Sequence, residues 1–155
     1  GVRWPGLISY VTPPGGGTTD YAVEIFYEAI KHRKYTNCFI KEGTYMDMMY
    51  MPDALKSAID IMEAEPEKLN HRNAYNVTAM SFAPEEVAKE IQKHIPDFFI
   101  DYEVDPVRQA IAESWPNKMD DSAARQDWGW NPKYDLASMT KDMLDKLTEK
   151  LKLKI

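Results

Sequence analysis

Apolar residues recur at helical spacing along most of the chain. Between residues 21 and 34 they fall at i, i+3, i+4, i+7 and i+8, which predicts an amphipathic helix with one buried face. The same spacing predicts four more helices, each with an inward apolar stripe. The five stripes are Ala22, Ile25, Phe26, Ala29 and Ile30; Leu55, Ala58, Ile59 and Met62; Val87, Ile91 and Ile95; Val107, Ala110, Ile111 and Ser114; and Leu136, Met139, Met143, Leu147 and Leu151.

Acidic residues and prolines mark the starts of these predicted helices. Asp53 is expected to cap the helix that follows it, and Asp135 to cap the last one. Pro84 fits the first helical position of the third helix, and Asp105 before Pro106 opens the fourth. Because the side chains of such residues satisfy free backbone N–H groups, we interpret Asp53 as a capping residue rather than a catalytic one.

Short runs of β-branched, aromatic and methionine residues separate the helices. They predict strands at residues 2–10, 36–40, 46–51, 74–77 and 98–104, the first of them interrupted at Pro5-Gly6. Strands that alternate with helices over short connections indicate an α/β fold.

A glycine-rich loop follows the first predicted strand. Gly15, Gly16 and Gly17 lead into Thr18, Thr19 and Asp20, which are three candidates for a helix N-cap. A strand end, a glycine loop and a helix N-terminus in succession are typical of sites that hold an anion. The same pattern also occurs in ordinary strand–loop–helix connections, so both interpretations stay open.

Composition narrows the classes of function. The 155 residues suffice for one domain with a core, and a net charge of −6 without a basic run argues against a nucleic-acid partner. No apolar run approaches the ~20 residues of a membrane helix, so we expect no membrane partner. The chain shows no secretory signal and starts within a predicted strand, which suggests a fragment. Cys38 is the only cysteine; it fits a reducing, cytoplasmic setting and a buried, inert thiol.

Few residues suggest catalysis by their spacing alone. The paired carboxylates Asp120 and Asp121 precede Ser122, where they are expected to cap a short helix. The three histidines, at positions 32, 71 and 94, lack ligand spacing, so we predict no metal site.

Three segments of the chain carry a resemblance to a known family: Arg3-Trp4-Pro5-Gly6, the loop from Pro13 to Val23, and the run from Asp105 to Pro116. They resemble the short-chain-type L-threonine 3-dehydrogenases of the extended short-chain dehydrogenase, or NAD-dependent epimerase/dehydratase, family. The resemblance covers essentially the whole chain but only the C-terminal half of such an enzyme. A turn at residues 127–132 also resembles the structural Gly-Trp-x-Pro turn of the extended family.

The resemblance implies a fold and a reaction. The fold would be the C-terminal part of a Rossmann-type nucleotide-binding domain plus a small mixed α/β substrate-binding cap. Residues 1–78 would complete the nucleotide-binding domain with connecting strands, 79–120 would form the cap segment, and 121–155 the C-terminal helices. The reaction would be NAD-dependent oxidation of the L-threonine hydroxyl to 2-amino-3-oxobutanoate, in a protein that is a homodimer at full length.

The resemblance also implies roles for individual residues. The backbone of Pro5, Gly6 and Leu7 would lie beside the nicotinamide of NAD. The catalytic Tyr-x-x-x-Lys of the family would lie in the missing N-terminal half, so no residue of this chain is expected to be catalytic. Tyr27 and Lys31 reproduce that spacing, but the family's pair precedes the strand that holds Arg3, and we therefore reject them. The residues expected to bind L-threonine are Gly17, Thr18, Thr19, Ser114 and Trp115.

Two other classes of function stay open at this stage. A sugar-nucleotide epimerase or dehydratase shares the fold, although the loop from Gly15 to Asp20 is unlike its usual sequence there. A non-catalytic binding module is the second alternative, and a cooperative melt of the isolated chain would favour it.

Overall fold

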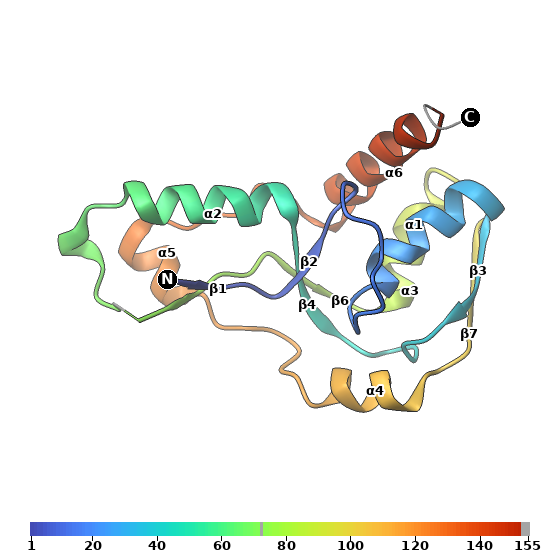
Figure 1. The fold of residues 1–155 in the computed structure, drawn as a ribbon, viewed down its shortest axis with the longest axis horizontal. Coiled ribbons are helices and arrows are strands. Elements are labelled where there is room, and N and C mark those ends of the chain that lie inside the picture. Colours follow the sequence, from blue (N-terminus) through green and yellow to red (C-terminus); the bar gives the residue numbers. More distant parts are fainter. Residues whose placement is uncertain (72, 153–155) are drawn as a thin grey trace.

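Strands and helices alternate along the chain in the computed structural model, which describes residues 1–71 and 73–152 (Figure 1). This arrangement confirms the predicted α/β class. The strands are β1 (Val2–Arg3), β2 (Gly6–Ile8), β3 (Lys34–Cys38), β4 (Met46–Tyr50), β5 (Tyr75–Asn76), β6 (Met80–Phe82) and β7 (Phe99–Tyr102). The helices are α1 (Tyr21–His32), α2 (Met51–Glu63), α3 (Pro84–Gln92), α4 (Pro106–Glu113), α5 (Ser122–Trp128) and α6 (Leu136–Lys152), with a 3₁₀ turn η1 (Pro66–Lys68).

The strands form three small sheets. β1 pairs with β5, β2 with β4, and β3 with β7, all in parallel. β6 adds to the second sheet antiparallel to β4, so that sheet joins the predicted regions 1–78 and 79–120. Residues 153–155, at the end of the third predicted region, lie outside the described residues. In the described ranges, no helix combines the length and apolar character that a membrane span requires.

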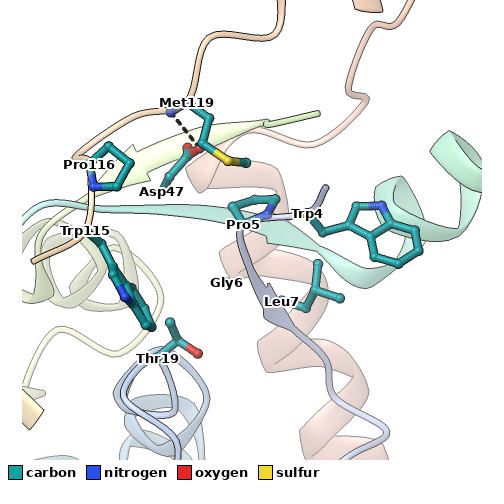
Figure 2. Close-up of a pocket in the computed structure, with 9 residues that line it drawn as sticks. All are labelled: Trp4, Pro5, Gly6, Leu7, Thr19, Asp47, Trp115, Pro116 and Met119. Carbon is teal, nitrogen blue, oxygen red and sulfur yellow. Dashed lines mark hydrogen bonds between the residues drawn. The ribbon is translucent and has the colours of Figure 1, made fainter. Parts of the chain in front are cut away.

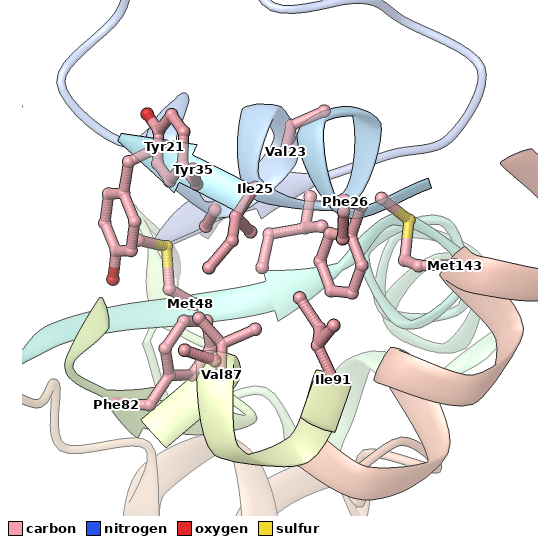
Figure 3. Packing of buried hydrophobic residues seen from close by; sticks show 14 of the residues in the cluster. Tyr21, Val23, Ile25, Phe26, Tyr35, Met48, Phe82, Val87, Ile91 and Met143 are labelled. Atoms are coloured by element: carbon pink, nitrogen blue, oxygen red, sulfur yellow. The ribbon is translucent and has the colours of Figure 1, made fainter. Parts of the chain in front are cut away.

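Two apolar clusters lie on either side of β4. The larger cluster packs Ile25 and Phe26 of α1 against Met48 of β4 and Val87 of α3, and α6 closes it (Figure 3). The smaller cluster joins Met49 to side chains of α2, α5 and β5. Successive side chains of a strand point to opposite faces, so adjacent methionines of β4 serve different clusters.

Most predicted starts and ends of helices are confirmed. Pro84 and Pro106 stand at the first positions of α3 and α4. The Asp105 carboxylate accepts hydrogen bonds from the N–H groups of Val107 and Arg108, at 2.9 and 3.2 Å. α1 ends at His32, where its C-cap residue Arg33 adopts the left-handed conformation (φ 56°), and β3 begins at Lys34, two residues earlier than predicted.

The predicted role of Asp53 is wrong. α2 begins at Met51 with Tyr50 as its N-cap, so Asp53 already lies in the first turn. Its carboxylate is 1% exposed and accepts hydrogen bonds from the N–H groups of Lys133 and Tyr134, both at 2.9 Å. Asp53 therefore attaches α2 to the segment that leads into α6, a contact between distant residues that a local pattern does not reveal.

The inward faces predicted for α2 and α4 are also wrong. Leu55, Ile59 and Met62 of α2 are 60%, 51% and 76% exposed, whereas Ala54 and Ser57 are buried. On α4, Gln109 and Ala112 are buried, and the predicted stripe is exposed: Val107, Ala110, Ile111 and Ser114. Helical spacing locates an apolar stripe but does not say whether this chain supplies the surface that covers it.

The turn at residues 127–132 is structural, as the resemblance implied. Gly129 adopts the left-handed conformation (φ 75°) and ends α5. Trp130 is buried, and its indole N–H donates to the Thr78 carbonyl at 3.0 Å. The predicted cap of α6 is confirmed, since Asp135 accepts from the Ser138 N–H at 2.8 Å.

Candidate functional site

A cavity of about 410 Å³ lies where the first strands, the loop before α1 and the α4–α5 connection meet (Figure 2). One wall comes from the junction of β1 and β2, and Thr19 and Trp115 lie on the other side of the opening. The lining is mostly apolar, with only a few polar groups, which is the usual character of a small-molecule site. The lining residues are Trp4, Pro5, Gly6, Leu7, Thr19, Asp47, Trp115, Pro116 and Met119.

Gly6 lets two walls of the cavity approach each other closely. A Cβ atom added to Gly6 would lie 2.5 Å from the Met48 sulfur and 2.7 Å from the Thr19 Cγ2 atom. Such distances are too short for non-bonded carbon and sulfur, so any side chain at this position would force the Met48 and Thr19 side chains to shift. Glycine thus places the β2 backbone directly against Thr19 and β4.

Trp4 is held in place by α2. Its indole N–H donates to the Ser57 hydroxyl at 2.8 Å, and that hydroxyl donates in turn to the Ala54 carbonyl at 2.7 Å. Because Ser57 is fully buried, this contact fixes the orientation of the indole at the edge of the cavity. Residue types alone gave no signal for a contact across 53 positions of sequence.

The N–H groups of the glycine loop hold a carboxylate of the chain itself. Asp20 accepts hydrogen bonds from Gly15, Gly16 and Gly17, at 2.7, 2.7 and 2.8 Å. The loop pattern predicted either an anion site or an ordinary connection, and an internal anion now occupies these three donors. Asp20 is the N-cap residue of α1 but makes no capping hydrogen bond with its side chain.

Replacing Asp20 with alanine is expected to loosen the glycine loop. Three N–H groups would exchange a charged acceptor for water, so we expect a loss of about 1 kcal/mol in the free energy of unfolding. Hydrogen exchange at residues 15–17 should accelerate at least tenfold. Asp145→Ala, which removes an exposed ion pair with Lys141 on α6, serves as the control and should change neither quantity appreciably. Unchanged exchange at the loop in the Asp20 variant would contradict this prediction.

Asp47 brings a buried charge to the cavity. One carboxylate oxygen accepts from the Thr78 hydroxyl, and the other accepts from the Met119 N–H at 3.0 Å. Asp47 is only 8% exposed. Burial raises the pKa of Asp47 above its ordinary value, while these two hydrogen bonds oppose the shift.

The cavity brings together five of the eight residues assigned to a site from the sequence: Pro5, Gly6, Leu7, Thr19 and Trp115. The three others lie outside its lining. Gly17 donates to Asp20, Thr18 is half-buried beside it, and the Ser114 hydroxyl turns back to the Ile111 carbonyl at 2.7 Å. Four further lining residues were not among the assigned ones: Trp4, Asp47, Pro116 and Met119.

Other candidate groups lie away from this cavity. Lys31 stands 5.4 Å from the centre of the Tyr27 ring, and both residues line a different hollow beside Pro13 and Pro14. Cys38 is buried, and burial raises the pKa of its thiol to about 12, as expected for an inert cysteine. Over residues 1–71 and 73–152, the acidic, histidine and cysteine side chains form no cluster suited to a metal ion.

Comparisons with known proteins place the chain among longer relatives. A protein of Staphylococcus haemolyticus, described as an uncharacterized epimerase/dehydratase, is 61% identical over 149 residues. That match covers 96% of this chain and 46% of the relative, so the chain spans about half the length of the curated relatives it matches. No family model matches the chain.

Solved structures resemble the chain in fold and sequence. L-threonine dehydrogenase from Clostridium difficile is 66% identical with a TM-score of 0.93, over 96% of this chain and 46% of that one. The holo form of a GalE-like L-threonine dehydrogenase from Cupriavidus necator is 54% identical with a TM-score of 0.90, over 94% and 47%. An NAD-dependent NDP-hexosamine 5,6-dehydratase is only 12% identical (TM-score 0.64; 96% and 45% covered) and shares the fold alone.

Proposed function

We propose that the chain is the C-terminal half of an extended short-chain dehydrogenase of the epimerase/dehydratase family, and that the longer protein is an NAD-dependent L-threonine 3-dehydrogenase. Here "the longer protein" means this chain preceded by a half like that of its relatives. The observation that carries the proposal is the 66% identity to a solved L-threonine dehydrogenase, which extends over 96% of the chain. The dehydratase that shares the fold has only 12% identity, which favours the amino acid over a sugar nucleotide as substrate.

The cavity fits the nicotinamide end of NAD. The wall formed by Pro5, Gly6 and Leu7 is apolar, and at Gly6 the backbone itself faces the cavity. A flat ring can lie against such a surface. When bound, NAD would accept the hydride that leaves the substrate carbon. These three residues would therefore hold the ring by contact and by excluding water from it.

Thr19 and Trp115 would bind L-threonine on the opposite side of the opening. No hydrogen bond within residues 1–71 and 73–152 uses the Thr19 hydroxyl, so it can donate to a substrate oxygen. The Trp115 indole, 43% exposed, would cover the substrate methyl group and reduce its contact with water. Gly17 and Thr18 would contact L-threonine from the adjacent loop, which the hydrogen bonds to Asp20 hold in place. Ser114 would contact it from the end of α4.

The proton of the substrate hydroxyl needs an acceptor, and we propose that this group lies in the preceding half. In the resembled family a tyrosine of a Tyr-x-x-x-Lys motif takes it, whereas Tyr27 and Lys31 do not line the cavity. This chain alone would position ligands without turning them over. We therefore expect no NADH formation by the 155 residues in isolation.

The exposed stripe of α2 supplies a surface for the preceding half. Leu55, Ile59 and Met62 lie at i, i+4 and i+7 on the face of α2 opposite its buried contacts. Three such side chains on one face form an apolar strip, and its exposure to water is unfavourable in free energy. We infer that the preceding half packs against this strip, and that the longer protein is a cytoplasmic homodimer whose subunit contacts lie mostly in that half.

In the longer protein, Ile59→Lys is expected to lower the free energy of unfolding by about 2 kcal/mol, because it would bury a charge in the proposed contact. Glu63→Lys, at an exposed position of the same helix, is the matched control and should change stability by less than about 0.5 kcal/mol. Chemical denaturation of both variants measures the difference. Equal, small effects would mean that the strip stays in contact with water.

The proposed activity is tested by NADH formation in the longer protein at saturating NAD, with L-threonine, L-serine and a nucleotide-sugar as alternative substrates. We expect NADH with L-threonine in clear preference to L-serine. Turnover of the nucleotide-sugar without L-threonine oxidation would instead assign the protein to the epimerase/dehydratase activities. A longer protein that folds but turns over none of the three would favour a non-catalytic binding module.

A further inference from the structure

The outer wall of the cavity has no regular secondary structure. Between the end of α4 at Glu113 and the start of α5 at Ser122, the chain follows turns and bends only. Trp115, Pro116 and Met119, all from this stretch, line the cavity. A wall of this kind needs contacts from elsewhere in the fold to hold one position.

Two residues that face each other across a strand pair supply such contacts. Asp47 of β4 and Ser81 of β6 are register partners. The Ser81 hydroxyl donates to the Asn117 carbonyl at 2.5 Å, and Asp47 accepts from the Met119 N–H at 3.0 Å. The sheet thus holds the backbone of the connection at two points, two residues apart.

Asp47 is itself held from several sides. The Thr78 hydroxyl donates to its second carboxylate oxygen, and the Thr78 carbonyl accepts from the buried indole of Trp130. Thr78 is 2% exposed, so this chain of contacts runs through the interior of the protein. A carboxylate fixed in this way presents its acceptor oxygen to Met119 in one defined orientation.

The same strand controls both walls of the cavity. Met48, adjacent to Asp47 on β4, pairs with Gly6 of β2 and lies against it. Asp47 reaches in the other direction, to the wall that carries Trp115 (Figure 2). The width of the opening between Gly6 and Trp115 therefore depends on β4, through a glycine contact on one side and a hydrogen bond on the other.

A buried carboxyl group is a costly way to fix a loop. A buried polar side chain loses solvation, and an apolar side chain at this position would avoid that loss. Its presence next to the cavity is accounted for if the hydrogen bond to Met119 sets the geometry of the site. A displaced wall would contact the substrate less well and so lower its affinity.

We propose that Asp47 and Ser81 are positioning residues that hold residues 115–119 as the outer wall of the cavity and so set the affinity for the substrate covered by Trp115. The identity of that substrate rests on the proposed function above. Neither residue takes part in the chemistry; each acts through the backbone that it holds.

The experiment compares Asp47→Ala, Asp47→Asn and Ser81→Ala in the longer protein. Asp47→Ala should raise KM for L-threonine at least tenfold with less than a threefold change in kcat, and Ser81→Ala should act in the same direction with a smaller effect. Asp47→Asn should restore KM to within threefold of the parent value, because its amide oxygen can accept from Met119 while its NH₂ group donates to Thr78. Asp101→Ala, at an exposed position of β7, is the control.

Hydrogen exchange of peptides spanning residues 115–121 gives a readout that is independent of activity. Exchange there should accelerate at least tenfold in Asp47→Ala and return to the parent rate in Asp47→Asn. If exchange in Asp47→Ala is faster but KM is unchanged, Asp47 is only a structural contact and the proposal is overturned. Unchanged exchange in Asp47→Ala would overturn it as well. If the parent protein does not oxidise L-threonine, the proposed function fails; the exchange rates, with KM for whichever substrate is turned over, then decide the role of Asp47.

Discussion

Replacing Gly6 with alanine is expected to lower kcat/KM for L-threonine in the longer protein by about 100-fold. The added Cβ would lie 2.5 Å from the Met48 sulfur and 2.7 Å from the Thr19 Cγ2 atom, so Thr19 and Met48 must shift away from β2. Such a movement shifts the proposed nicotinamide wall relative to the proposed substrate contact. Because hydride transfer requires the two ligands at a defined separation, a shift of about 1 Å suffices for an effect of this size.

Gly15→Ala is the matched control for this substitution. Gly15 lies in the same segment of chain, has no neighbouring atom within 4 Å of the added Cβ, and does not adopt a left-handed conformation. It should leave kcat/KM within threefold of the parent value. Steady-state kinetics with both variants, together with thermal melts to confirm folding, measure the difference. Similar kinetics for the two alanine variants would mean that the contact of Gly6 with Thr19 does not set the geometry of the site.

The sequence predicted local features of the site better than its distant contacts. The break in the first strand, the close approach of backbone at Gly6 and the helix that follows Asp20 are consequences of a few adjacent residues, and all are present, although the break covers Trp4 and Pro5 and Gly6 already lies in β2. The contact of Asp47 with Met119 spans 72 positions. Residue types carry no record of which distant segments a fold brings together, so neither this contact nor that of Trp4 with Ser57 was predictable.

The two wrong helix faces have a related physical origin. An apolar stripe at helical spacing predicts that something covers it, and for α1, α3 and α6 the covering surface lies within this chain. For α2 the stripe of Leu55, Ile59 and Met62 remains exposed, while the small residues Ala54 and Ser57 face the interior. Taking the larger side chains as the inward face was correct for α1, α3 and α6. It failed for α2, whose exposed stripe is the surface proposed above to contact the preceding half.

Capping residues show the same division between local and distant causes. Asp105 and Asp53 both stand next to a proline at a helix start, and both were expected to bind the first turn of their own helix. Asp105 does so. Asp53 instead binds N–H groups that lie 80 and 81 positions away in the chain, and its own helix starts without a side-chain cap. The pattern that indicates a cap therefore indicates an acceptor near backbone N–H groups, without specifying which ones.

Asp53→Ala is expected to destabilise the protein by about 3 kcal/mol, because it leaves the N–H groups of Lys133 and Tyr134 without their charged acceptor beside a buried position. Asp53→Asn keeps one acceptor oxygen and turns its NH₂ group toward the other donor, so about half of the loss should remain.

Asp60→Ala provides the control on the same helix. The Asp60 side chain is partly exposed and, among the described residues, forms an ion pair with Lys56 alone, so its removal should cost less than about 0.5 kcal/mol. Chemical denaturation of the longer protein, followed by the fluorescence of its tryptophans, measures all three variants. If Asp53→Ala and Asp60→Ala unfold at the same denaturant concentration, the link between α2 and the segment before α6 does not stabilise the fold. The 133–134 segment would then be held by the burial of Trp130 and of the inward face of α6 alone.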